Sequence, residues 1–153
     1  MKLIPFRDVL LVKNSDSFWA SAVKFFLKSQ YVHSEYVIDD WLTFGTDISR
    51  PASIHTFGYN LADIDIYRYK WDISDSQRCI ITEELQKFTK LSYDSIEALF
   101  LGLGLKYRGR DNRYICISLI LKAMEKAGML PSDSYKIYRD FSVFTDGEYF
   151  IKM

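Results

Sequence analysis

The segment Tyr31–Ile38 constrains the fold more than any other part of this 153-residue chain. Its β-branched and aromatic side chains favour a strand, and the period of two along a strand places His33 and Glu35 on the same face. A second segment, Tyr114–Ile120, is typical of the beginning of a helix and contains Cys116. We expect the chain to fold so that the sulfur of Cys116 and the imidazole of His33 lie side by side.

Strand patterns and helix patterns follow one another irregularly, which predicts an α+β fold: an antiparallel sheet packed against helices, with the cysteine-bearing helix late in the chain. A length of 153 residues suits one domain over residues 1–153, and a hydrophobic content of 48% supplies a sizeable core. The expected strands are residues 9–12, 31–38, 41–44, 53–57, 62–69, 135–138 and 148–151. The expected helices are residues 17–28, 75–88, 93–103 and 113–127.

Capping residues define the expected beginnings of the helices. Ser74 and Gln77 have the spacing of a capping box, Ser92 is expected to cap the next helix, and either Asp111 or Asn112 the last one. The stripe expected to be buried on the last helix consists of Cys116, Leu119, Ile120, Ala123 and Ala127.

Proline, glycine and apolar runs indicate where other elements end. Residues 45–52 contain Pro51 and are expected to form a loop. Gly128 is expected to end the last helix. Residues 9–12 are an unbroken apolar run, which is typical of a strand buried on both faces.

Charge and cysteine content exclude several classes of function. Lysine plus arginine and aspartate plus glutamate number 20 each, so a net charge near zero gives no electrostatic basis for binding nucleic acid or an anionic membrane. No apolar run has the length of a transmembrane helix, and the N-terminal residues lack the pattern of a signal peptide. Two cysteines do not make a disulfide framework. We therefore expect a cytoplasmic protein in a reducing compartment.

Cys116 is the candidate nucleophile. Free backbone N–H groups and the positive end of the helix dipole favour a thiolate in the first turn of a helix, and the same N–H groups can stabilise an oxyanion. The other interpretation is that Cys116 is a small, inert residue of the buried stripe.

His33 is the candidate general base, because a thiol nucleophile needs an imidazole within hydrogen-bonding reach. The other interpretation is a surface or capping histidine. A third polar group is expected to orient the ring, and two candidates remain: Glu35 on the same strand face, and Thr43 on the neighbouring strand of the hairpin. A metal site formed by His33, Glu35 and His55 is a further alternative, although the spacing fits no familiar zinc pattern, so we expect no metal and no cofactor.

Three segments resemble a known family. Arg7–Val12 resembles a "GD-I-L-L-V" opening strand, and Tyr31–Glu35 resembles an "S-H-x-E" segment. Tyr107, followed by Asn112–Ile120, resembles a "Y-x-C-S-E-L-V" segment that holds the nucleophile. In this order the segments resemble the circularly permuted papain-like proteins, the YiiX/YycO-like branch of the NlpC-type cysteine hydrolases.

The resemblance implies a permuted papain-like domain with Cys116 and His33 as nucleophile and base. It implies amide or ester hydrolysis, or acyl transfer, through a thioester, on a small-molecule, peptide or lipid acyl substrate. Tyr107 is expected beside the substrate, and Tyr114 and Tyr31 are further pocket candidates. The alternative is an inactive binding or structural module on the same fold, such as a phage or viral accessory protein. The oligomeric state stays open.

Overall fold

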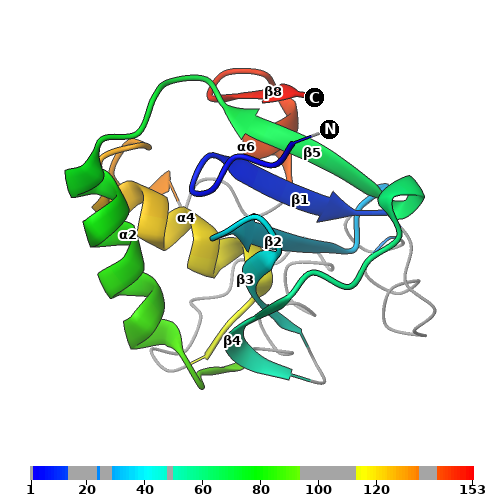
Figure 1. Ribbon diagram of the computed structural model, residues 1–153, viewed down its shortest axis with the longest axis horizontal. Coiled ribbons are helices and arrows are strands. Elements are labelled where there is room, and N and C mark those ends of the chain that lie inside the picture. Colours follow the sequence, from blue (N-terminus) through cyan, green and yellow to red (C-terminus); the bar gives the residue numbers. More distant parts are fainter. Residues whose placement is uncertain (1, 14–23, 25–28, 48–49, 94–112, 135–140) are drawn as a thin grey trace.

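The computed structural model in Figure 1 describes residues 2–13, 24, 29–47, 50–93, 113–134 and 141–153. A six-stranded antiparallel sheet, in the order β4-β3-β2-β1-β5-β8, is the centre of this part of the chain. Its strands are β1 (Asp8–Val12), β2 (His33–Val37), β3 (Leu42–Asp47), β4 (Arg50–Thr56), β5 (Ile64–Tyr69) and β8 (Phe150–Lys152). The other elements are the 3-10 helix η1 (Leu61–Asp63), the helices α2 (Asp75–Phe88), α4 (Cys116–Lys126) and α6 (Ser142–Thr145), and the short strands β6 (Ser92–Tyr93) and β7 (Arg113–Tyr114).

The larger hydrophobic core lies between one face of the sheet and the helices. Val9 and Leu11 of β1 and Tyr36 of β2 are fully buried there. They share this core with Ile81 of α2 and Ile120 of α4. Figure 1 shows α2 and α4 together beside the strands. Because side chains alternate along a strand, the residues between these buried ones point away from the helices.

The opposite face of the sheet is buried as well. Leu10, Val12 and Val37 form a second, smaller core with β5, and the chain between β4 and β5 covers it with Phe57 and Tyr59. All five residues of β1 are therefore buried, which confirms the prediction from its unbroken apolar run.

The prediction that residues 45–52 form a loop is wrong. Strand β3 continues through Gly45 to Asp47, and β4 already begins at Arg50 and includes Pro51. Proline is tolerated here because β4 is an edge strand of the sheet. The β3–β4 register also shifts between Gly45 and Asp47, close to Pro51.

The expected caps at Ser92 and at Asp111 or Asn112 are also wrong for the described residues. Ser92 belongs to β6, which pairs in parallel with β7. Because β7 is extended up to Tyr114, α4 begins at Cys116 with Ile115 as its N-cap, and no side chain caps it. The predictions for residues 94–112, for 135–138 and for most of 17–28 lie outside the described residues.

The other helix predictions are confirmed. Ser74 and Gln77 form both bonds of a capping box, and α2 buries Ile81, Leu85 and Phe88. Every residue of the expected α4 stripe is buried. Gly128 follows the helix with a φ of +70°, a conformation that glycine adopts without steric cost.

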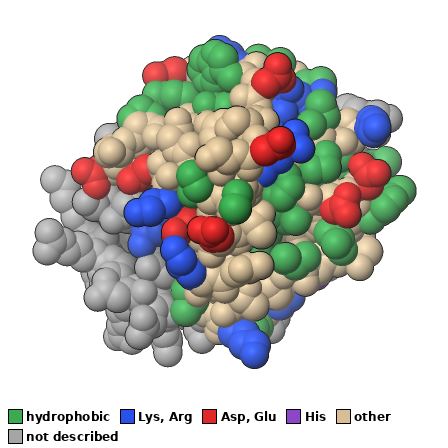
Figure 2. Space-filling model, turned by 60° about the vertical axis from the view of Figure 1, so that its left-hand side comes forward, with side chains coloured by type: hydrophobic (Ala, Val, Ile, Leu, Met, Phe, Trp, Pro, Cys, Tyr) green, Lys and Arg blue, Asp and Glu red, His purple; other side chains and the backbone are tan. Residues whose placement is uncertain are grey.

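The surface agrees with the balanced charge of the sequence. Figure 2 shows lysine and arginine side chains intermingled with aspartate and glutamate on the face in view. Within the described ranges, no helix combines the length and the apolar character needed to cross a bilayer.

The capping box predicts a measurable loss of stability. Ser74→Ala leaves the Gln77 N–H at the beginning of α2 without its acceptor, and we expect the free energy of unfolding to fall by about 1 kcal/mol. Urea denaturation measures the change. Ser76→Ala, an exposed serine in the same first turn, is the control and should change stability by less than half as much. Equal effects of the two substitutions would contradict the role of the cap.

Candidate active site

Cys116 is the first residue of α4, and the N-cap before it, Ile115, makes no side-chain hydrogen bond to the first turn. The backbone N–H groups of the first turn have no partners within the helix, and they create a positive end beside the sulfur. The side chain is buried, with 6% of the residue exposed.

His33 begins β2 and contacts Cys116 from the sheet. Burial lowers the pKa of the His33 imidazole, but the charge of Cys116 and hydrogen bonds to Cys116 and Glu35 raise the pKa well above its usual value. Burial likewise raises the pKa of the Cys116 thiol, and the charge and hydrogen bond of His33 bring the pKa below its usual value. The two groups therefore favour a thiolate–imidazolium pair.

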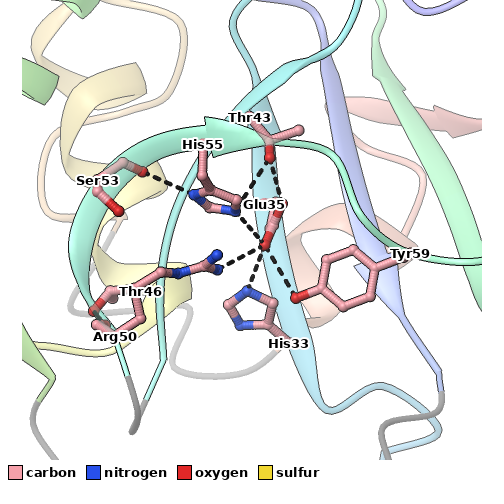
Figure 3. A network of polar contacts seen from close by, with 8 residues as sticks. All are labelled: His33, Glu35, Thr43, Thr46, Arg50, Ser53, His55 and Tyr59. Carbon is pink, nitrogen blue, oxygen red and sulfur yellow. Dashed lines mark hydrogen bonds and ion pairs between the residues drawn. The ribbon is translucent and has the colours of Figure 1, made fainter.

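Glu35 holds the other side of the imidazole (Figure 3). Its Oε1 lies 3.2 Å from His33 Nε2, and Glu35 is fully buried. Because Nε2 is engaged by this carboxylate, Nδ1 is the ring nitrogen left to face the sulfur. Buried carboxylates are costly unless they are paired, so the network around Glu35 must supply compensating donors.

Four side chains supply these donors in addition to His33. Arg50 Nη2 lies 3.2 Å from Oε1, His55 Nε2 lies 2.9 Å from it, and the Tyr59 hydroxyl donates to it over 3.1 Å. The Thr43 hydroxyl donates to Oε2 over 2.5 Å. Burial raises the pKa of Glu35, but hydrogen bonds from His33, His55 and Thr43 and the charge of His33 hold the pKa well below its usual range.

Of the two candidates for orienting the ring, Glu35 is the one in contact with His33. Thr43 binds Glu35 and lies 3.4 Å from His55 Nε2, so it fixes the carboxylate rather than the imidazole.

His55, Arg50 and Tyr59 are the residues of this network that sequence reasoning did not assign to an orienting role. The signal for His55 was the strand register: Thr43 and His55 are direct partners across the β3–β4 hairpin. The expectation of a loop at residues 45–52 concealed this hairpin, and with it the approach of Arg50. Tyr59 comes from the covering chain after β4, whose path no local pattern predicts.

Gly45 leaves room for the network. A Cβ atom on Gly45 would lie 3.2 Å from Glu35 Cγ and 3.5 Å from His33 Nε2. A side chain at this place on β3 would therefore press on Glu35, while its Cβ would make an ordinary van der Waals contact with His33.

Tyr31 is a core residue in the structure. It is 2% exposed, and its hydroxyl contacts Asp65 Oδ2 at 2.7 Å and the Tyr67 hydroxyl at 2.8 Å, so its expected role in a pocket stays a prediction. Its position just before β2 places the side chain in the larger core. Tyr107 lies outside the described residues, and only the backbone of Tyr114, in β7, is described.

The metal alternative fits the geometry poorly. His33 and His55 both direct Nε2 at the same oxygen of Glu35 over hydrogen-bonding distances, and the Arg50 guanidinium shares that oxygen. Among the residues that the structure describes, no cluster of three or more potential ligands has the arrangement of a metal site.

The described fold defines an α+β domain in which a six-stranded antiparallel sheet packs against the cysteine-bearing helix. No family model and no curated protein matches the chain. A solved structure, metalloprotein yiiX from Escherichia coli O157:H7, DUF1105, is similar with a TM-score of 0.51 and 14% sequence identity. The match covers 80% of this chain and 66% of that one, so the chain spans slightly less than two thirds of its length. A likeness at this identity concerns the fold, and it supports the resemblance to YiiX at that level.

The space at Gly45 leads to a paired test. We expect Gly45→Ala to lower the free energy of unfolding by about 1–3 kcal/mol, because the added methyl group presses on the buried Glu35 side chain. Gly58→Ala is the matched control, because its Cβ would meet a single atom, Thr56 O, at 3.9 Å. Chemical denaturation of both variants checks the difference, and a loss in Gly58→Ala as large as in Gly45→Ala would refute it.

The low pKa of Glu35 predicts how stability depends on pH. Because the pKa of the folded state lies below that of the unfolded state, the contribution of Glu35 is present above about pH 4.3 and is lost as the pH falls through the folded pKa. We expect Glu35→Gln to lower the free energy of unfolding at neutral pH by about 3 kcal/mol or more.

The same variant should also flatten the acid limb of the stability curve. One titrating group contributes at most about 1.4 kcal/mol per pH unit to that slope, and Glu35→Gln removes this contribution. Denaturation at a series of pH values checks it. Glu83→Gln, at an exposed position of α2, is the control and should leave both quantities unchanged. An unchanged acid slope in Glu35→Gln would contradict the low pKa.

Proposed function

We propose that this chain is a thiol-dependent hydrolase or acyltransferase that acts on an amide or ester bond. The observation that supports this proposal best is the contact of Cys116, at the beginning of α4, with an imidazole that a buried carboxylate holds from behind. Nucleophile, base and orienting group stand in the order that acyl transfer requires.

The proposed reaction uses these groups in sequence. His33 takes the thiol proton, and the sulfur of Cys116 bonds to the carbonyl carbon while an electron pair moves onto the carbonyl oxygen. The backbone N–H groups at the beginning of α4 stabilise this oxyanion. His33 then returns the proton to the leaving amine or alcohol as its bond to carbon breaks, which leaves a thioester.

A second acyl transfer releases the product. His33 deprotonates the acceptor, which is water in a hydrolase and another nucleophile in an acyltransferase. The acceptor bonds to the thioester carbon, the C–S bond breaks, and the sulfur recovers its proton from His33. Glu35 stabilises the imidazolium in both halves of the reaction and keeps the ring turned toward the sulfur.

The finer structural proposal is that the domain is a circularly permuted papain-like, NlpC-type domain. The likeness to yiiX supports it at the level of the fold, and the order of the segments around His33 and Cys116 supports it in the sequence. The substrate class stays broad: a small molecule, a peptide or a lipid acyl group.

The low exposure of the two reacting groups favours a second candidate, an inactive binding or structural module. Cys116 is 6% exposed and His33 is 7% exposed. A module of this kind would retain the buried polar network for the stability of the sheet, and its sulfur would behave as an ordinary buried thiol.

Alkylation separates the two candidates. We expect iodoacetamide to modify Cys116 near neutral pH, well below the ordinary thiol pKa of about 8.5, because His33 stabilises the thiolate. His33→Ala should move the midpoint of the pH profile up by one unit or more, which lowers labelling at neutral pH by about tenfold or more. Mass spectrometry of peptides locates the adduct, and the exposed Cys79 is the internal reference.

The contrary result is equally clear. If Cys116 reacts more slowly than Cys79 at every pH, and His33→Ala changes nothing, the thiol is not activated and the module is the better description. A panel of ester, amide and thioester probes, with Cys116→Ala as the blank, then identifies the class of substrate for an activated thiol.

A further inference from the structure

Ser34 stands next to His33 on β2, and its side chain points to the opposite face of the sheet, toward α4. The residue is fully buried. Within the described part of the chain, its hydroxyl makes no hydrogen bond of ordinary geometry. A buried hydroxyl without a partner costs free energy, so its presence calls for a physical reason.

The polar group beside this hydroxyl is the sulfur of Cys116. The side chain and the backbone of Ser34 both contact the thiol and favour its charged form. A neutral thiol is a weak acceptor, whereas a thiolate accepts strong, charge-assisted hydrogen bonds. The hydroxyl is therefore poorly satisfied while the sulfur is protonated and well satisfied once the proton has moved to His33.

We infer that Ser34 is a further catalytic residue, whose hydroxyl donates a hydrogen bond to the Cys116 sulfur in its thiolate form; this inference rests on the proposed function. Adjacent residues of β2 then act on the sulfur from two directions. His33, backed by Glu35, takes the proton and provides the opposite charge. Ser34 provides a neutral donor that does not change its protonation.

The strength of the Ser34 hydrogen bond changes with the charge on the sulfur during the reaction. When the sulfur bonds to the carbonyl carbon, negative charge moves to the carbonyl oxygen and the Ser34 hydrogen bond weakens. When the thioester is cleaved, the charge returns to sulfur and the bond strengthens. Ser34 therefore increases the fraction of thiolate at a given pH and favours sulfur as the leaving group, at some cost in the intrinsic nucleophilicity of the sulfur.

The test measures the thiolate itself. In a Cys79→Ser background, so that Cys116 is the reporter, the rate of iodoacetamide alkylation is followed across pH for the parent and for Ser34→Ala. We expect the midpoint to rise by about one unit in Ser34→Ala, with about tenfold less labelling below the parent midpoint. The backbone N–H of residue 34 is kept, so the change isolates the hydroxyl.

Denaturation distinguishes this role from a structural one. Because the hydroxyl lacks an ordinary partner, Ser34→Ala should keep or raise the stability of the parent. Ser134→Ala is the matched control: Ser134 is equally buried, but its hydroxyl donates to Pro131 O over 2.5 Å. This control should lose stability without moving the Cys116 midpoint.

Three outcomes overturn the inference, and they are distinguishable. An unchanged midpoint in Ser34→Ala, with a low midpoint in the parent, refutes the role of Ser34 and leaves the proposed function intact. A parent midpoint at the ordinary thiol value refutes both. A clear loss of stability in Ser34→Ala indicates that the hydroxyl has a structural partner.

Discussion

A single carboxylate oxygen, Oε1 of Glu35, is the point on which the site depends. His33, Arg50, His55 and Tyr59 all direct a polar atom at it within 2.9–3.2 Å, although they come from two strands and the covering chain. A buried carboxylate is stable only when it is paired in this way. The pairing therefore has two effects. The same groups that stabilise the buried charge of Glu35 also fix the carboxylate that orients the His33 imidazole.

The sheet brings these groups together through register. His33 and Glu35 share a face of β2, and Thr43, Gly45 and His55 lie on the same face of β3 and β4. The helix side of the sheet carries the nucleophile. Cys116 lies at the beginning of β2. The first two residues of this strand, His33 and Ser34, point in alternating directions and contact the same sulfur from two sides.

The sequence allowed α2, the buried stripe of α4 and the central strands to be predicted because their patterns are local. The capping box at Ser74 and the apolar run of β1 each determine an element with few neighbours involved. The failures are non-local. Pro51 is tolerated because β4 lies at one edge of the sheet. Ser92 is extended because it pairs with Arg113, about twenty residues away in the sequence. Of the site, the juxtaposition of His33, Glu35 and Cys116 was foreseeable, whereas the approach of Arg50 and His55 required the β3–β4 register.

Strand β4 is connected to both halves of the site. It brings Arg50 and His55 to Glu35, and the backbone of Ala52 exchanges hydrogen bonds of 2.9 and 2.7 Å with Leu91 and Lys90, just before β6. Strand β6 pairs with β7, and the cysteine follows two residues after Arg113–Tyr114. An insertion in β4 would thus displace both the Glu35 carboxylate and the Cys116 nucleophile. Loop grafting for protein engineering has a safer location in the Asp39–Asp40 turn, whose residues are exposed and belong to no strand.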